Sequence, residues 1–538
     1  MKKNIYILLA ATLAATSCTN LNEVVYDQLT DQKYYENFSE SDIPGAIATV
    51  YSDLRQLYAT TGAHTNGCYL YTNEEVGDSW VTPSRNTAWY DGGIYINLNQ
   101  HKWTIDHAHF LNNWRLAYKS INTCNRLLYE FSSADIPDET KAKLEAELRV
   151  ARAFWYYVLC DMYGNVPLIT SYVTPKGWLP ETSPRADIFD FLVTEIQETR
   201  NLLSAKSYGR WDQGAAAMLL AKIYLNAEVW IGEPHWDEVV ALCDEIIDSP
   251  NYSLDGDYKS IFVTENQGSP EIIMAACNDE KYDYTAFEIH LWSHYWDAKY
   301  HYDTETWFWG GCCATPELAN SYDSDDKRFE KSWAEGKLYD NTGEKTGIPG
   351  SPLLCVSDPL DVEARRQVEY TRDIPIYHPG DPTRMTGEGP GVRMNKYEVK
   401  RKAKNLLSND FVIFRYADVL FMKAEALWRD AGNIADQTVC DLINDVRRRA
   451  FDNFTEDKKV TPSNLTADRF LQEYAWEFCQ EGHRRQQMIR FGVFTTKSWF
   501  DHTPSIDPKW NLFPIPYEEL LANENLVQNP GYPRTPEF

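Results

Sequence analysis

Residues 147–170 read ELRVARAFWYYVLCDMYGNVPLIT, and this stretch, with the few residues before it, carries the strongest helical pattern of the chain. Apolar side chains recur at steps of three and four, at Leu144, Leu148, Ala151, Trp155, Val158, Leu159 and Met162. That spacing places them on one face of an amphipathic helix. The stretch therefore predicts a helix from Leu144 to Met162.

The same pattern continues on both sides of this helix. One helix is predicted to begin at Ser183, which would be its N-cap, with Pro184 at the first helical position. The other predicted helices are Trp114–Phe131, Gln213–Trp230, Trp236–Asp248, Tyr416–Arg429, Gln437–Arg449 and Ala467–Phe478. They come in neighbouring pairs with short connections, as tetratricopeptide helix pairs do. The sequence predicts a mainly α fold with this helical scaffold at about 40–60, 110–250 and 410–490.

Two regions, about 60–110 and 250–405, lack the helical period. They are rich in Gly, Pro, Asp, Asn and aromatic residues, with turn signals such as Gly310-Gly311. We expect long irregular loops with a few short strands. Loops carried by a rigid scaffold are where binding residues concentrate, so the ligand-binding region is expected here.

The composition limits the partners. The 538 residues include 52 basic and 79 acidic side chains, a formal net charge of -27. Such a field repels polyphosphates, which makes nucleic acid an unsuitable partner. The 11 cysteines are dispersed and include no C-x-x-C pair. Five of them, Cys124, Cys160, Cys243, Cys440 and Cys479, fall in helical patterns, where we expect small buried side chains.

The N-terminus has the layout of an export signal. Lys2 and Lys3 precede a short apolar stretch, and small residues lead into Cys18. Residues 1–17 are therefore predicted to be a lipoprotein signal peptide, and Cys18 the lipidated first residue of the mature chain. A plain secretory signal is the alternative. No window of the mature sequence approaches the roughly 20 apolar residues that a membrane-spanning helix needs.

Aromatic residues gather in one non-helical segment. Between Tyr282 and Trp309 there are 11 aromatics in 28 residues, where the chain average of 14% predicts about four. Flat rings beside polar side chains suit the apolar faces of sugars. We predict glycan contacts at Trp296, Tyr300, Trp307 and Trp309. The alternative is that these rings fill a core beneath a long loop.

Two further features are candidates for the same site. Cys312 and Cys313 follow directly, and we predict a vicinal disulfide that helps to form the sugar platform; two buried free thiols are the alternative. In the other loop region, Arg85, Trp89 and Asp91 surround a tight turn. Trp89 would stack, and Arg85 and Asp91 would pair with hydroxyls. The alternative for Asp91 is a role in the turn alone.

Patterns for catalysis and cofactors are absent from the sequence. It contains no phosphate-binding G-x-x-x-x-G-K-[ST] loop, G-x-S-x-G elbow, H-E-x-x-H or EF-hand loop. His101, His107 and His109 lack the spacing of metal ligands, so structural roles are expected. We predict no cofactor and no metal. A pair of carboxylates for glycoside hydrolysis remains open, because sequence does not give their separation.

Five motifs in order resemble the SusD/RagB family. They are the stretch 147–170 quoted above, FRYADVLFMKAEAL from Phe414, INDVRRRA from Ile443, FCQEGHRRQQMIRFG from Phe478, and LFPIPYEELLANENLVQNPGY ending at Tyr532. The loop that contains Trp89 also resembles a variable loop of the family. The resemblance implies that residues 18–538 form a SusD-like nutrient-binding domain of an outer-membrane lipoprotein. It also implies a partner, a SusC-like TonB-dependent transporter over which the protein acts as a lid.

The leading hypothesis is a non-catalytic glycan-binding lipoprotein, lipid-anchored to the outer membrane at the cell surface. It would capture an oligo- or polysaccharide and deliver it to the transporter. Two alternatives remain open at this point. One is a peptide-binding lipoprotein on the same scaffold, and the other is a secreted helical glycoside hydrolase.

Overall fold

The computed structural model describes residues 38–58, 68–86, 88–281, 289–358, 361–381, 383, 385–404 and 407–536. The predicted signal peptide and Cys18 lie outside these residues, as do the aromatic residues Tyr282, Tyr284 and Phe287.

Helices dominate the chain, as predicted. The helices of six or more residues are α3 (Ile43–Tyr58), α5 (Ile94–Asn99), α6 (Ala108–Ser133), α7 (Asp138–Tyr163), α8 (Arg185–Thr199), α9 (Gln213–Leu225), α11 (Trp236–Ile247), α14 (Pro316–Ser321), α15 (Lys327–Ser332), α16 (Tyr416–Asp430), α17 (Gln437–Arg447), α18 (Ala467–Phe478), α19 (Arg484–Arg490) and α20 (Tyr517–Ala522). Short helices are α4 (Cys68–Leu70), α10 (Ala227–Ile231), α12 (Ile289–Ser293) and α13 (Lys299–Tyr302).

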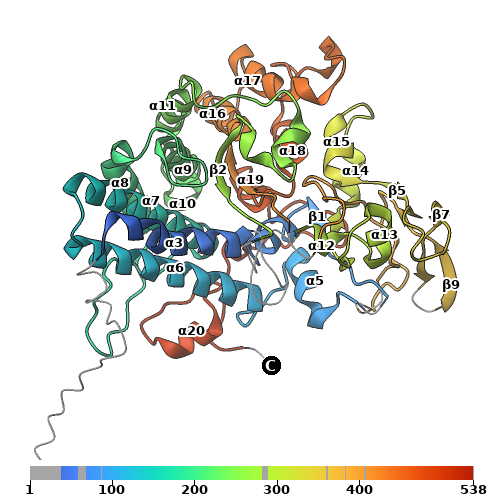
Figure 1. The fold of residues 1–538 in the computed structure, drawn as a ribbon, viewed down its shortest axis with the longest axis horizontal. Coiled ribbons are helices and arrows are strands. Elements are labelled where there is room, and N and C mark those ends of the chain that lie inside the picture. Colours follow the sequence, from blue (N-terminus) through green and yellow to red (C-terminus); the bar gives the residue numbers. More distant parts are fainter. Residues whose placement is uncertain are drawn as a thin grey trace, which may run out of the picture.

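Eight helices form one continuous array. Each packs against the next in the order α3, α6, α7, α8, α9, α11, α16, α17. We call these eight the helical array; it fills the left and upper part of Figure 1. The step from α11 to α16 spans about 170 residues of sequence. The prediction of a mainly α fold built from packed helix pairs is confirmed.

Helix α7, which contains most of the quoted stretch, is more buried than its period predicts. Every side chain from Val150 to Tyr163 is buried, not one face alone. The charged side chains of this segment form buried ion pairs with neighbouring helices. Arg152 pairs with Glu195 of α8 at 2.5 Å, and Asp161 pairs with Arg485 of α19 at 2.7 Å. The helix is therefore central to the array, with neighbours on all sides.

Two predicted boundaries need correction. Ser183 does not cap α8, which begins at Arg185 with Pro184 as its N-cap residue. The predicted helix Gln213–Trp230 is two helices, α9 and α10, that meet at Asn226. The Lys222 carbonyl accepts from the side-chain amide of Asn226 at 2.8 Å and from its backbone N–H at 3.3 Å, so Asn226 caps the C-terminal end of α9.

The residues between α11 and α16, which we call the insert (residues 248–415), hold most of the strands. All sheets among the described residues are two-stranded and antiparallel. The pairs are β1 (Trp80–Val81) with β3 (Cys313–Ala314), β2 (Ile272–Ala276) with β12 (Phe411–Arg415), β4 (Trp333–Ala334) with β11 (Arg393–Met394), β5 (Gly336–Lys337) with β10 (Glu369–Tyr370), β6 (Tyr339–Asp340) with β7 (Ser351–Pro352), and β8 (Leu354–Asp358) with β9 (Asp361–Gln367). The pair β2–β12 closes the base of the insert, and β9 lies at its outer edge (Figure 1).

Charged side chains are buried where the insert meets the helices. Arg415, at the end of β12, contacts Glu271 at 2.8 Å, Glu477 at 2.9 Å and Glu481 at 2.8 Å. We call the following side chains the junction network: Arg328, Lys396, Arg415 and Arg449 with Glu271, Asp326, Glu477 and Glu481. Glu473 and Arg447 extend it, because Glu473 contacts Arg328 and Arg447. Each buried charge thus faces opposite charges, which compensates charges that would be costly to bury alone.

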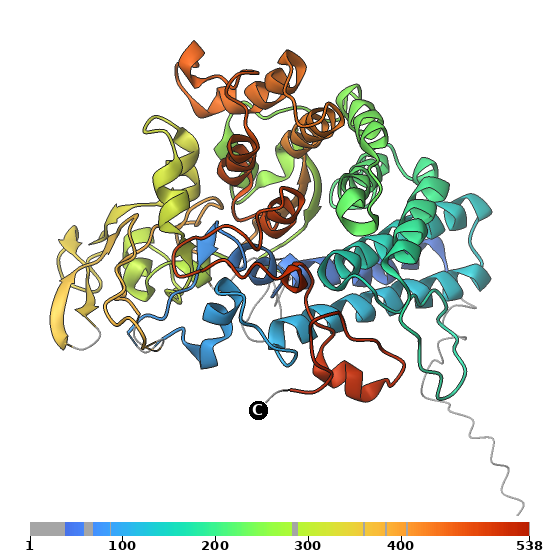
Figure 2. The ribbon, with the colours of Figure 1, turned by 180° about the vertical axis from the view of Figure 1, so that it is seen from behind.

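The last helix, α20, lies below α6, as the rear view shows (Figure 2). Arg115 of α6 pairs with Glu518 at 2.8 Å and with Glu519 at 2.7 Å, both on α20. Within the described residues, no helix has the length and apolar character that crossing a membrane requires.

Candidate functional site

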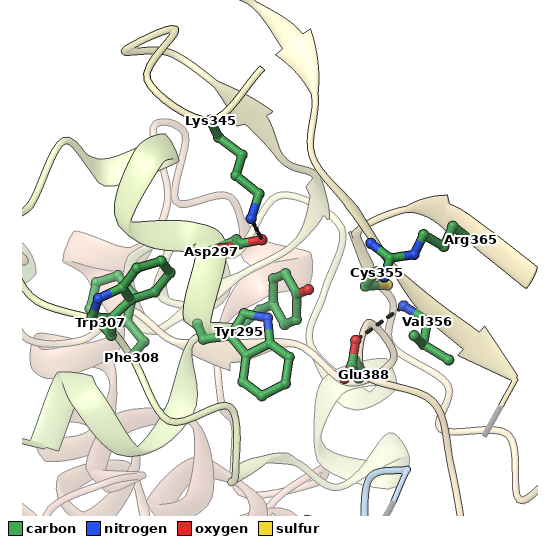
Figure 3. A pocket seen from close by; sticks show the side chains of 10 residues that line it. Tyr295, Asp297, Trp307, Phe308, Lys345, Cys355, Val356, Arg365 and Glu388 are labelled. Atoms are coloured by element: carbon green, nitrogen blue, oxygen red, sulfur yellow. Dashed lines mark hydrogen bonds and ion pairs between the residues drawn. The ribbon is translucent and has the colours of Figure 1, made fainter. Parts of the chain in front are cut away.

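An open cleft of about 480 Å³ lies on the insert (Figure 3). Three segments build it: the chain from Tyr295 to Phe308, the turn that follows β6, and the β8–β9 hairpin with Glu388 beside it. The lining residues are Tyr295, Trp296, Asp297, Trp307, Phe308, Lys345, Cys355, Val356, Arg365 and Glu388.

Indole rings form one side of this cleft. Trp296 is 45% exposed and Trp307 is 48% exposed, whereas Tyr295 just before Trp296 and Phe308 just after Trp307 are buried. Trp307 meets Tyr300 edge to face at 5.8 Å between ring centroids, and the Lys299 ammonium lies 4.1 Å from the Trp307 ring centroid. Neighbouring side chains therefore hold Trp307 in place while much of the ring stays open to solvent.

Charged groups form the other side. The Lys345 ammonium lies 3.3 Å from an Asp297 carboxylate oxygen, and Glu388 accepts the Val356 N–H at 3.1 Å. Burial raises the pKa of Glu388 above its ordinary value. Arg365 reaches in from β9, is exposed, and forms no ion pair with any other residue that the structure describes. Hydrogen-bond donors and acceptors thus stand opposite apolar rings, the combination that suits a carbohydrate.

The turn that presents Lys345 is built on one carboxylate. Asp340 is buried, and its side chain accepts the N–H groups of Gly343 at 2.7 Å, Lys345 at 3.0 Å and Thr346 at 2.8 Å. These and further hydrogen bonds to the ionised form outweigh its burial and lower the pKa of Asp340 to about 2. Asp340 therefore stays charged and fixes the cleft rim.

The structure corrects the expectation for Arg85. Its side chain is buried, and its guanidinium donates to the carbonyls of Gly311 at 3.0 Å, Gly387 at 3.2 Å and Pro390 at 2.8 Å. Nη2 donates to Cys313 Sγ at 3.2 Å. With every nitrogen engaged, Arg85 ties three loops together and does not face the cleft.

The predicted vicinal disulfide is also absent. Cys312 and Cys313 are free, fully buried thiols with different surroundings. Cys312 Sγ lies 3.9 Å from Met394 Sδ, and Cys313 Sγ lies 3.5 Å from the Val81 carbonyl. The alternative of two buried thiols is correct, and neither sulfur forms part of an open platform. The five cysteines expected in the helical patterns are buried free thiols as well.

Trp89 and Trp309 lie beside each other, outside the cleft lining. The Trp89 indole N–H donates to the Trp309 carbonyl at 2.6 Å, and the Trp89 ring covers Gly311, where a Cβ atom would come within 2.7 Å of it. Trp309 is 37% exposed and Trp89 is half-buried. Asp91 is exposed at the start of a tight turn. These three stay predicted ligand contacts.

Sequence reasoning missed the polar side of the cleft. Asp297 lies inside the aromatic segment and could have been found as the acid next to Trp296. Lys345, Arg365 and Glu388 come from three separate stretches, and nothing local distinguishes them from other surface charges. Among the described residues, no group of three or more His, Cys, Asp or Glu side chains is placed to hold a metal ion.

The architecture defines a class of protein: a helical-repeat scaffold whose long insert carries an open aromatic cleft. Two family models cover most of the chain. The model described as "SusD family" matches residues 270–532, and the one described as "Starch-binding associating with outer membrane" matches residues 29–225. The chain belongs to the SusD/RagB family.

Individual relatives are distant but nearly full-length. Starch-binding protein SusD of Bacteroides thetaiotaomicron is 23% identical, over 84% of this chain and 80% of the relative. SusD-like protein P25 of Formosa agariphila is 23% identical, over 98% of this chain and 99% of the relative. Among solved structures, surface glycan-binding protein A from B. thetaiotaomicron, in complex with laminarihexaose, is similar with a TM-score of 0.67 and 20% identity, covering 91% of this chain and 100% of that chain. At this identity the structural likeness establishes the fold.

Proposed function

We propose that this protein is a cell-surface glycan-binding protein that captures an oligo- or polysaccharide in the cleft of the insert. One observation carries the proposal: Trp296 and Trp307 line the same open cleft and keep nearly half of their surface exposed. A core-filling role does not account for exposed indoles in a hollow. Apolar sugar faces would stack on the rings, while Asp297, Lys345 and Arg365 would bind hydroxyl groups.

The names of the relatives support this ligand class. SusD of B. thetaiotaomicron is named as starch-binding, and two of the similar structures are titled as a laminarin-binding SusD-like protein and a laminarihexaose complex. These names describe binding proteins. We propose binding without hydrolysis, with Asp297 and Glu388 serving as hydrogen-bond partners of the glycan.

We further propose that Cys18 is lipidated and anchors the protein to the outer membrane, facing outward. The signal layout before Cys18 and the description "Starch-binding associating with outer membrane" support this location. A SusC-like TonB-dependent transporter would receive the glycan, as the family resemblance implies. Copurification of a large barrel protein with the lipidated chain in mild detergent would test the partnership.

The glycan proposal is tested by affinity electrophoresis of the folded protein in gels containing different polysaccharides. We expect at least one polysaccharide to retard the native protein. The double variant Trp296→Ala/Trp307→Ala should migrate freely in the same gel. Trp178→Ala is the matched control, because Trp178 is 44% exposed on the loop between α7 and α8, far in sequence from the cleft.

Two results would contradict the proposal. One is free migration of the native protein on every polysaccharide together with calorimetric binding of peptides, which would favour the peptide-binding alternative. The other is release of reducing ends from a retarding polysaccharide by purified protein, which would make it an enzyme.

A further inference from the structure

A basic surface borders the cleft. Residues 400–404 read KRKAK, and Lys281 lies against the same hollow of about 750 Å³. We call these five cations the basic band: Lys281, Lys400, Arg401, Lys402 and Lys404. Among the described residues, the acids Glu280 and Glu305 line this hollow with them. Four cations in the five residues 400–404 contrast with a chain that has 79 acidic against 52 basic side chains.

Backbone hydrogen bonds fix the band beside the aromatic segment. The Lys402 N–H donates to the Asp303 carbonyl at 2.6 Å, and the Glu305 N–H donates to the Ala403 carbonyl at 2.8 Å. Trp307 follows Glu305 by two residues. The same short segment, 303–307, thus separates the basic band from the cleft, and a ligand longer than a few sugars that leaves the cleft on this side would reach the band.

The positive charges of the band are only partly balanced. Lys400 pairs with Glu280 at 2.9 Å, whereas Arg401 and Lys402 share the single carboxylate of Asp303 at 2.8 and 2.5 Å. Lys281 and Lys404 are exposed and form no ion pair within the part of the chain that the structure describes.

The cleft lining holds two cations and two acids, but one cation, Arg365, is left without an ion pair among the described residues. Its two acids are engaged, Asp297 by Lys345 and Glu388 by the Val356 N–H, while Arg365 is exposed with no ion pair to a described residue. An arginine guanidinium matches a carboxylate or sulfate with two parallel hydrogen bonds. Lys299 lies next to the Trp307 ring and adds a cation at the edge of the cleft. It forms no ion pair with any residue that the structure describes.

We propose that the glycan is anionic, a polysaccharide carrying carboxylates or sulfates, whose sugar faces stack in the cleft while its charges bind Arg365 and the basic band. This inference rests on the proposed function and narrows it to one substrate class. The net charge of -27 does not oppose it at contact distance, because physiological salt screens exposed charges beyond about 8 Å.

The test is calorimetry of the full chain with polygalacturonate, chondroitin sulfate and neutral starch at low and at physiological salt. We expect tighter binding of at least one anionic glycan than of starch. Binding of the anionic glycan should weaken steeply as salt rises, because a polyanion releases counterions when cations contact it. Starch binding, where present, should be insensitive to salt.

Charge-reversal variants test whether the basic band binds the anionic glycan. Lys281→Glu/Lys404→Glu should weaken binding of the anionic glycan roughly tenfold or more and flatten its salt dependence. Lys102→Glu/Lys176→Glu makes the same change in net charge at exposed positions away from the band and should leave affinity almost unchanged. Circular dichroism of both variants checks that they fold. Lys281→Gln/Lys404→Gln repeats the test without added acids.

Three outcomes would overturn the inference. They are no binding of either anionic glycan, equal loss in the band and control variants, or binding that ignores salt. Retardation of the same protein by neutral glycans would then show that the proposed function survives. Binding of no glycan in any assay would overturn the proposed function as well.

Discussion

Two arginines summarise how differently two parts of the molecule use charge. Arg415, at the junction of insert and helices, is buried and contacts three carboxylates. Arg365, on the cleft wall, is exposed and pairs with no carboxylate of the described residues. The charges of the junction pair with one another inside the fold, whereas the cleft leaves Arg365 available to a ligand.

The tryptophans divide in the same way. Trp155 in the centre of α7 and Trp292 of α12 are fully buried, while Trp296 and Trp307 stay open. Residue type alone therefore does not distinguish the tryptophans that build the core of this chain from those that are candidates for ligand binding. Substitutions in the junction network should therefore change stability, and substitutions in the cleft should change affinity alone.

The largest effect is expected from Arg415→Met, which breaks the junction network. Removal of the guanidinium leaves Glu271, Glu477 and Glu481 with less positive charge around them in a buried site. Loss of one partner from a buried ion network costs about 3 to 5 kcal/mol. Urea unfolding at neutral pH, followed by circular dichroism, measures the change in the free energy of unfolding.

Arg115→Met is the matched control, since Arg115 also contacts two carboxylates but its side chain is 54% exposed. Exposed ion pairs contribute at most about 1 kcal/mol. Equal destabilisation by the two substitutions would break the contrast between buried and exposed charge.

The next largest effect is expected at acid pH, where the protein should lose stability because a buried carboxyl of the helices becomes protonated. Burial opposes ionisation of Glu425, but the charges of Arg490 and Arg429 outweigh it and lower the pKa from 4.5 to about 2. A carboxyl whose pKa is depressed in the folded protein stabilises the fold at every pH above its pKa in the unfolded chain. This stabilisation disappears as the pH falls from 4.5 towards 2. The shift corresponds to about 3 kcal/mol.

Glu425→Gln isolates this contribution. At pH 7 the variant should unfold about 3 kcal/mol more easily than the native protein, and the difference should shrink below pH 4.5. Burial also lowers the pKa of His101 to about 3, so both proteins should lose further stability together below pH 6.5. In the opposite direction, burial raises the pKa of Glu75 to about 8, which favours the fold at low pH in both proteins. A difference that stays constant with pH would refute the assignment to Glu425.

Sequence predicted the helices because their period is local. The pattern from Leu144 to Met162 lies inside α7, and Ala467–Phe478 matches α18 at both ends. It missed the first six residues of α7, Asp138–Lys143, because they are polar and show no apolar period. The sequence pattern indicated roughly where the insert begins and ends. It did not predict the pairing of β2 with β12, which joins residues more than 130 positions apart.

The site was half predictable for the same reason. A local excess of aromatics identified Trp296 and Trp307, which the structure brings into one cleft. Arg85 was expected at the surface because it lies in a polar loop, but carbonyl groups more than 220 residues away cover it. Long-range contacts of this kind leave no trace in a local pattern.

A smaller effect, confined to the cleft, is expected from Trp307→Ala. Removing an aromatic ring on which a nucleic-acid base stacks costs about 1 to 3 kcal/mol, and a stacked sugar should behave similarly. We expect the affinity for the retarding glycan to fall while the unfolding midpoint stays within error of the native value. Calorimetry and urea unfolding on one preparation measure both. A large loss of stability would place Trp307 with the structural tryptophans, and Trp178→Ala should change neither quantity.

The smallest effect is expected from oxidation and reduction at the cysteine pair. Burial raises the pKa of both Cys312 and Cys313, which suppresses the thiolate that disulfide formation needs. Cys313 also accepts a hydrogen bond from Arg85, so its sulfur is held within the loop junction. Dithiothreitol should therefore leave both the melting temperature and the glycan affinity unchanged. Thiol titration of the denatured protein should give the same number with and without reductant. A deficit of two thiols without reductant, together with a reductant-dependent affinity, would contradict this assignment and support the vicinal disulfide.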